Sequence, residues 1–265
     1  MPRSVASVLS NAEDFRAALS MDGFRSLVVT SQGRFRARLT QVALNHMRLA
    51  AGEEELSRIA FVAVPTDTVL VSFTIGDRSA PIWGGAEVRA GEIITLGPSQ
   101  RIHARTDGPS RWGSIELPSD DFARYGHALT GAEFAFPPAA RWRPPSAAFR
   151  QLRHFHRAAI RAAEMRSRAL ADNEAAHGLE HQLIHALVEC VSPGSADEET
   201  EATRRHRSIV TQFEDLLQHQ PIPDIAEICV ALGISERMLR QYCDEQLGMG
   251  ADDYCNLRGR TTRLT

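Results

Sequence analysis

Two arginines and a glutamine lie three and four residues apart near the C-terminal end of the sequence, at Arg237, Arg240 and Gln241. Residues at this spacing share one face of a helix. An arginine guanidinium can form two hydrogen bonds with the edge of guanine, and a glutamine amide can do the same with adenine. A helix that exposed these three side chains could therefore read base pairs in the major groove of DNA.

The residues around this trio predict two short helices joined by a tight turn. The first helix begins at Asp224, a good N-cap, and Glu227 can complete a capping box. Gly233 can adopt the positive φ that ends this helix, and Ser235 can cap the second. Hydrophobic residues at helical spacing predict the packed face of the pair. They are Ile225, Ala226, Ile228, Cys229, Leu232, Met238, Leu239, Tyr242, Cys243 and Leu247.

This segment resembles the first helix-turn-helix of AraC/XylS-type transcription regulators. The resemblance is carried by LGISERMLRQYCDEQLGM (residues 232–249), followed by Tyr254 and Arg258. It implies a DNA reader of two helix-turn-helix units joined by a long helix that carries Tyr254 and Arg258, usually behind a cupin-like sensory domain. It also implies sequence-specific DNA binding in response to a small-molecule effector. The predicted DNA-binding residues are Ser235, Glu236, Arg237, Arg240 and Gln241.

The resemblance covers only the first of these two units. Eleven residues follow Tyr254, too few for two more helices, so we expect a chain truncated after the first helix-turn-helix. An incomplete sequence, a truncated gene and a natural short form remain open. Residues 204–265 carry eight arginines against nine acidic residues, which predicts modest, salt-sensitive DNA affinity. The alternative function is a dimerising protein with weak or no DNA binding that acts as a negative partner.

Length and composition agree with a two-domain, water-soluble protein. The chain has 265 residues, 43% of them hydrophobic, and a formal net charge of −3. No apolar signal core and no long apolar run is visible, so we expect a cytoplasmic protein without a membrane segment. No two cysteines form a CxxC pair, and buried structural thiols are the favoured interpretation. The cysteines are Cys190, Cys229, Cys243 and Cys255.

Short strands separated by Gly, Pro, Asp and Ser dominate the N-terminal half and predict a sandwich or small barrel. With the resemblance, the expected fold class is α+β: an N-terminal antiparallel β-barrel, cupin-like, with flanking helices, followed by an all-α helix-turn-helix unit. The predicted strands cover residues 25–30, 35–39, 59–64, 69–75, 86–89, 92–96, 101–105 and 112–117. The predicted helices of the remaining chain cover residues 12–19, 119–130, 146–170, 173–191 and 204–220.

These elements divide into a sensory and dimerisation domain over residues 1–191, a flexible acidic linker over 192–203, and a partial DNA-binding domain over 204–265. Within the first domain, the β part covers about 24–118 and the helices about 119–191. A proline-rich segment at residues 137–145, after the first of these helices, should be stiff and extended. The resemblance implies dimerisation through the helices. One of them carries a basic stripe that is either a solvated face or a contact with the DNA backbone: Arg150, Arg153, Arg157 and Arg161.

The β domain also contains side chains suited to a small-molecule pocket, which is usually apolar with a few polar groups. The residues predicted to line it are Arg36, Trp83, His103 and Trp112. Ordinary roles in a core or on the surface remain open for each of them. His46, His103 and His127 form no HxH motif, so we expect no metal, no cofactor and no enzymatic activity. The expected partners are double-stranded DNA, an unidentified effector, a second copy of the chain and, as a further possibility, RNA polymerase.

Overall fold

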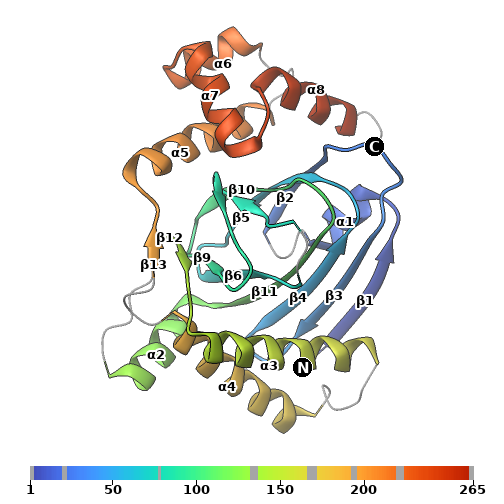
Figure 1. Cartoon of the computed structure of the whole chain (residues 1–265), viewed down its shortest axis with the longest axis vertical. Coiled ribbons are helices and arrows are strands. Elements are labelled where there is room, and N and C mark those ends of the chain that lie inside the picture. Colours follow the sequence, from blue (N-terminus) through green and yellow to red (C-terminus); the bar gives the residue numbers. More distant parts are fainter. Residues whose placement is uncertain are drawn as a thin grey trace.

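The computed structural model describes residues 3–19, 23–76, 79–131, 137–165, 172–191, 196–218 and 224–262. Two antiparallel β-sheets form its centre, with one group of helices on each side (Figure 1). The strands are β1 Arg3–Leu9, β2 Phe24–Val29, β3 Ala37–Ala43, β4 Arg48–Glu54, β5 Arg58–Ala63, β6 Thr68–Thr74, β7 Ile82–Trp83, β8 Ala86–Glu87, β9 Ile93–Leu96, β10 Arg101–Thr106, β11 Ser110–Pro118, β12 Ala139–Trp142 and β13 Ala196–Glu198. The helices are α1 Ala12–Leu19, α2 Ser119–Thr130, α3 Ser146–Glu164, α4 Asn173–Cys190, α5 Glu201–Leu216, α6 Ile225–Leu232, α7 Glu236–Leu247 and α8 Ala251–Thr262.

The strands divide between two sheets. The larger sheet has the order β1-β3-β4-β11-β6-β9-β12-β13, and the smaller has the order β2-β5-β10-β7-β8. Hydrophobic side chains from both sheets, among them Leu27, Val62, Leu70 and Ile94, pack into one cluster between them. The predicted α+β class and its antiparallel β domain are confirmed. In the described part of the chain the strands form two facing sheets, not one closed barrel.

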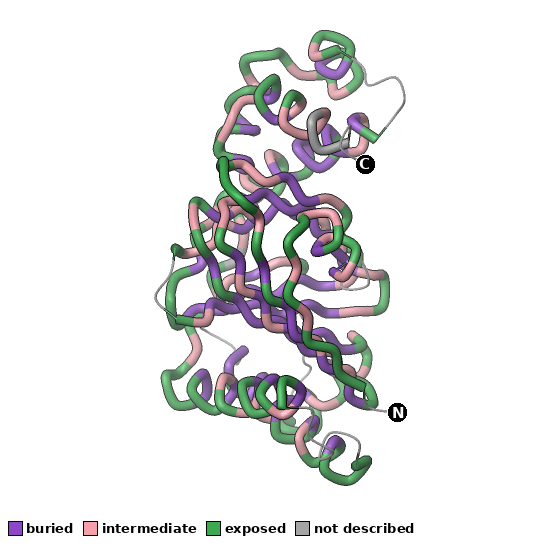
Figure 2. Tube along the Cα trace, turned by 90° about the vertical axis from the view of Figure 1, so that its right-hand side faces the viewer, coloured by how far each residue is buried: buried purple, intermediate pink, exposed green. Residues whose placement is uncertain are grey.

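Helices α3 and α4 cover the outer face of the larger sheet. The apolar face of α3 contributes Phe149, Leu152 and Ile160 to a second cluster, and α4 adds Leu183 and Leu187. Phe149 meets Phe73 of β6 edge-on, with ring centroids 5.9 Å apart. The faces of these helices that point away from the sheets are exposed (Figure 2). The two amphipathic helices predicted from the sequence therefore pack on the β domain and on each other.

Four helices, α5 to α8, form a third cluster over the smaller sheet (Figure 1). Phe213 of α5, Leu239 of α7 and Tyr254 of α8 are completely buried in it. Val28 and Ile59 reach this cluster from the smaller sheet, so the helical unit and the β domain share part of their packing. The predicted linking helix is present as α8, and it carries Tyr254 and Arg258.

The structure differs from the prediction in the segments expected to be irregular. β1 forms before residue 24, and β4 lies between predicted strands, at the centre of the larger sheet. β12 lies in the proline-rich segment and pairs with β13, which lies in the segment predicted as a flexible linker. Residues 192–195 of that linker fall outside the described ranges. The division at residues 191 and 203 stays a prediction.

The four cysteines are free thiols, three buried and Cys255 half-buried, as expected for structural thiols. Burial raises the pKa of the Cys190 thiol to about 12 and that of Cys255 to about 11, with a smaller contribution from nearby acidic side chains. Within the described ranges, no helix combines the length and the apolar character needed to cross a membrane.

Candidate nucleic-acid interface

The helix-turn-helix is built from capping interactions that the sequence predicted. Asp224 Oδ1 accepts a hydrogen bond from the backbone N–H of Glu227 at 2.8 Å, and Glu227 Oε2 accepts one from the N–H of Asp224 at 3.1 Å. This reciprocal pair is the predicted capping box. Gly233 ends α6 with φ of +65°, a conformation in which a side chain would be strained. The turn therefore fixes the orientation of α7 relative to α6.

The N-terminal half of α7 carries the five predicted DNA-binding residues, and all five are exposed: Ser235, Glu236, Arg237, Arg240 and Gln241. The Ser235 hydroxyl oxygen caps the helix by accepting from the N–H of Met238 at 3.3 Å. Among the described residues, Arg237 and Arg240 have no ion-pair partner. The Gln241 amide donates to Glu245 at 3.1 Å. Two guanidinium groups are therefore available beside a helix N-terminus, which itself favours anions.

The opposite face of α7 is fully engaged in packing. Leu239, Cys243 and Leu247 are buried in the helical cluster. Tyr242 stacks on His206 of α5, with ring centroids 4.0 Å apart, and the His206 ring also bonds Glu245 at 2.7 Å. Only one face of α7 is therefore open, and it is the face that carries the two arginines.

The C-terminal end of α7 is attached to the β domain. The Gln246 amide, which is buried, donates to the carbonyl oxygen of Gly84 at 3.1 Å. Gly248, which ends the helix with φ of +73°, lies so close to Arg105 that a Cβ there would be 2.6 Å from the guanidinium Nη1. Because this end faces the small sheet, the N-terminal half of α7 points away from the β domain (Figure 1).

A buried carboxylate joins the helical unit to the small sheet. Glu214 of α5 has no exposed surface and accepts hydrogen bonds from Tyr254 at 2.8 Å and from Ser26 of β2 at 3.0 Å. The His103 ring lies 3.5 Å from the same carboxylate, and Arg258 forms an ion pair with it. Burial alone would raise the pKa of Glu214, but His103, Arg258 and Tyr254 outweigh it and hold that pKa below its ordinary value. Glu214 is thus a buried anion bonded to α8, β2 and β10.

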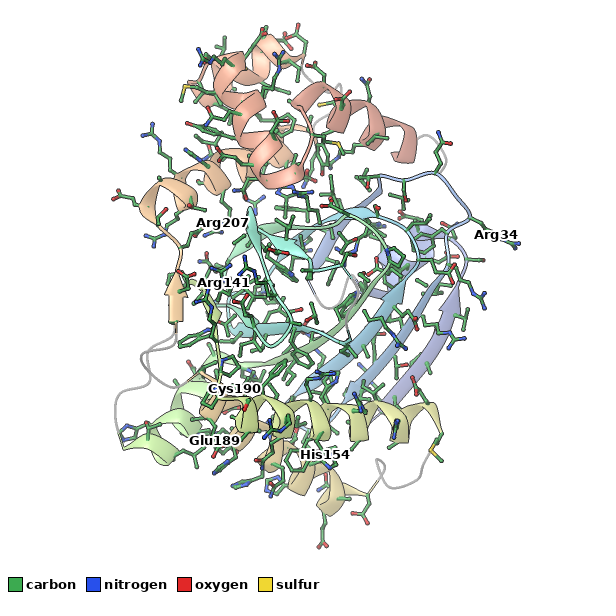
Figure 3. All side chains as sticks on the ribbon, in the orientation of Figure 1. Arg34, Arg141, His154, Glu189, Cys190 and Arg207 are labelled. Atoms are coloured by element: carbon green, nitrogen blue, oxygen red, sulfur yellow. The ribbon has the colours of Figure 1, made fainter. Side chains whose placement is uncertain are left out.

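A second polar joint surrounds Arg207 of α5, labelled in Figure 3. Its guanidinium donates to the carbonyl oxygen of Arg101 at 2.7 Å and to the Gln100 side chain at 3.2 Å, and it pairs with Glu199 at 2.9 Å. Arg101 in turn forms a two-point ion pair with Asp215. Both joints involve α5, which makes this helix the main connection between the two parts.

Neither joint was predicted from the sequence. Glu214 lies in α5 between Phe213 and Leu217, which pack into the helical cluster, and this was the available signal. A carboxylate on an otherwise apolar helix face requires a buried partner. Its partners lie far away in the sequence, so the pairing itself was not visible there.

The four residues predicted to line an effector pocket do not share one cavity. Trp83 and Trp112 do meet, in the space between the two sheets, but the cavity there has a volume of only about 20 Å³, room for about one water molecule. His103 lies on the other face of β10 and packs against Tyr254. Arg36 lines a separate surface hollow. Of the four, only Trp83 and Trp112 therefore line a common cavity.

Three of the interior polar side chains beside this cavity bond to one another. The buried Arg58 guanidinium pairs with Glu54 at 2.7 Å and donates to the carbonyl oxygen of Ala104 at 3.1 Å. The Trp112 indole N–H donates to the same Glu54 at 2.7 Å. Within the described ranges, no group of three His, Cys, Asp or Glu side chains converges in a way that could hold a metal ion.

Comparison with known proteins adds information on the fold. No protein-family model matches the chain. No curated protein matches it either. Among solved structures, the AraC-like transcriptional activator CuxR superposes with a TM-score of 0.52 at 16% sequence identity, covering 98% of this chain and 95% of that one. The chain therefore shares its overall fold with this structure over nearly its whole length. This agrees with the predicted β domain followed by a helical unit.

Two weaker similarities were also found. Unsaturated fatty acid-bound ToxT from Vibrio cholerae strain SCE256 has a TM-score of 0.34 at 10% identity, covering 81% of this chain and 79% of that one. KdgF from Halomonas sp. has a TM-score of 0.26 at 10% identity, covering 37% of this chain and 97% of that one. At these scores neither similarity supports a conclusion about this protein.

Proposed function

We propose that this protein is a transcription regulator that binds specific DNA sequences through α7. Arg237, Arg240 and Gln241 would contact base edges in the major groove, and Ser235 would lie at the helix N-terminus beside a phosphate. Glu236 would face the bases as a hydrogen-bond acceptor. The rest of the chain would act as a sensory domain for a small-molecule effector. The protein would have no catalytic role and no cofactor, and it would act in the cytoplasm.

One observation carries this proposal. Arg237 and Arg240 are exposed, have no ion-pair partner among the described residues, and lie on the open face of α7 in a correctly capped helix-turn-helix. An arginine that only keeps the protein soluble can lie anywhere on its surface. Two arginines three residues apart, beside a helix N-terminus that points away from the molecule, have the placement that major-groove reading requires.

The charge around α7 sets the expected strength of binding. Asp244 near the end of α7 and Asp252 and Asp253 at the start of α8 are exposed and would repel phosphate wherever they approached it. Few positive charges are available to neutralise the DNA backbone, so the affinity should be modest and should fall steeply with salt. Two copies of the reader in a homodimer would compensate by binding two half-sites together. RNA polymerase is a further proposed partner.

Selection of bound DNA from a random double-stranded pool at low salt tests the proposal. The full chain should enrich one sequence motif over successive rounds. A two-fold repeat of that motif would agree with a dimer, and its spacing would give the distance between the two α7 helices. Recovery of DNA without any enriched motif would contradict sequence-specific reading. No recovery of DNA at all would favour the alternative function, a dimerising negative partner.

A further inference from the structure

A hollow with a charged lining lies outside the β domain, between α3 and the outer face of the larger sheet. Its volume is about 380 Å³, within the range of about 300–1,000 Å³ that small-molecule sites occupy. It is formed on one side by strands β3, β4, β6 and β11 and on the other by the second half of α3. The site is at the opposite end of the molecule from α7 (Figure 1).

Arginine dominates this groove, which we call the α3 groove. Five arginines line it against two glutamates, an excess of three positive charges in a chain whose net charge is −3. Three of the arginines follow one another at four-residue intervals along α3, so they lie on successive turns and face the same way. The charged lining residues are Arg38, Arg111, Arg153, Arg157, Arg161, Glu53 and Glu164.

The sheet side of the groove is set by strand register. Arg38 of β3 and Arg111 of β11 both pair in register with Glu53 of β4, so the two arginines flank this glutamate on adjacent strands. Arg111 forms an ion pair with Glu53 at 3.2 Å. Within the described ranges, Arg38, Arg157 and Arg161 have no ion-pair partner. Like charges on successive helical turns repel one another, and an anion bound between them would remove that repulsion.

The floor of the groove is apolar and closely packed. His156 of α3 is 1% exposed and its ring Nε2 donates to the carbonyl oxygens of Ala50 and Ser114, at 3.1 and 3.3 Å. This approach requires a glycine at Gly113, because a Cβ there would lie 2.9 Å from the His156 ring. Phe73, Ile75 and Ile160 complete the apolar wall. The groove therefore offers an apolar surface beside a cluster of guanidinium groups.

We infer that the α3 groove binds a small organic phosphate, whose phosphate groups pair with the arginines of α3 and whose organic part lies against the apolar wall. Guanidinium groups form two-point hydrogen bonds with phosphate, and several of them around one site suit a ligand with more than one negative charge. The same ligand is the effector of the transcription regulator. The effector role rests on the proposed function, whereas binding of the phosphate in the groove does not.

Calorimetric titration of the full chain with inorganic pyrophosphate tests the phosphate contacts. Pyrophosphate should bind saturably, and Arg157→Gln should weaken it by about tenfold or more, the loss expected for one hydrogen bond between charged groups. Arg150→Gln is the matched control, because Arg150 is exposed on the same helix and changes the net charge equally but does not line the groove. Its affinity for pyrophosphate should equal that of the wild type. If Arg157→Gln fails to fold, Arg161→Gln takes its place.

Two further titrations test the class of ligand. Phenyl phosphate should bind more tightly than inorganic phosphate, because only the former can use the apolar wall, and pyrophosphate should bind more tightly than citrate. Three results would each contradict the proposed site. They are no saturable binding of pyrophosphate, equal weakening of its binding by Arg157→Gln and Arg150→Gln, and tighter binding of citrate than of pyrophosphate. The effector role is tested separately, by measuring the affinity for selected DNA with and without phenyl phosphate. Equal affinity in the two cases, in a protein that binds pyrophosphate in the groove, would overturn the effector role alone.

Discussion

The Tyr254 hydroxyl donates a hydrogen bond of 2.8 Å to Glu214, and both side chains are completely buried. The bond connects α8 to α5, and the same carboxylate also bonds Ser26 and lies against His103 of the small sheet. One buried anion thus holds together two helices of the C-terminal helical unit and the small sheet of the β domain.

Removing the Tyr254 hydroxyl should weaken this joint. Tyr254→Phe keeps the ring in the helical cluster but takes away a donor to a buried carboxylate, which should cost about 1–3 kcal/mol of the free energy of unfolding. Tyr125→Phe is the control, since in the described part of the structure the Tyr125 hydroxyl has no hydrogen bond. Denaturant unfolding of the full chain measures both. Equal stability of the two variants would show that the hydroxyl bond contributes nothing to the joint.

His156 should make the protein less stable as the pH falls below neutral. Burial lowers the pKa of His156 to about 4, although its bonds to the Ala50 and Ser114 carbonyls oppose the shift. Between about pH 6.5 and 4 the unfolded chain therefore binds a proton that the folded chain does not, so stability declines with falling pH. The contribution of this residue is roughly 3 kcal/mol over that window. His156→Gln should lack this decline.

A matched histidine on the same helix provides the control for that experiment. His154 is exposed on α3, and its side chain is labelled in Figure 3. His154→Gln should show the same dependence of unfolding free energy on pH as the wild type. If His156→Gln also retained the full decline, the buried neutral state of His156 would not be its cause.

Gly113 should tolerate no side chain. A Cβ at this position would lie 2.7 Å from the Phe73 ring and 2.9 Å from the His156 ring, both of which are packed in the core. Gly113→Ala should therefore lower the melting temperature, at a cost of about 1–3 kcal/mol for overpacking. Gly178→Ala, in α4 with no atom within 4 Å of the added Cβ, should instead raise it by removing a helical glycine. A Gly113→Ala variant as stable as Gly178→Ala would contradict the packing described for the groove floor.

Local signals in the sequence predicted the helices well. α2 begins at Ser119 and ends at Thr130, as expected, and Gly131 takes the left-handed conformation that ends it. Pro118 occupies the N-cap position of this helix, with no side-chain bond. In the helix-turn-helix, the caps and the glycine turn were both correct. Such features depend on neighbouring residues alone, so they are visible in a single sequence.

Features that depend on distant residues were not predictable in the same way. The sequence of β4, RLAAGEE, is rich in residues that are rare in strands, and pairing with β3 and β11 overrides this preference. The basic stripe of α3 was visible, but its opposite wall comes from Arg38 and Arg111, which only the strand register brings together. The Glu214 joint likewise joins residues from four separate elements.

DNA binding by Arg237 and Arg240 is the central claim, and fluorescence anisotropy with a labelled selected duplex tests it most directly. The double variant Arg237→Ala/Arg240→Ala should weaken binding of that duplex by about 100-fold or more, as expected for loss of two base contacts of about 1–3 kcal/mol each. Arg205→Ala, an exposed arginine of α5, should have a much smaller effect. Binding of the selected duplex by the double variant with wild-type affinity, in a protein that remains folded, would contradict the account.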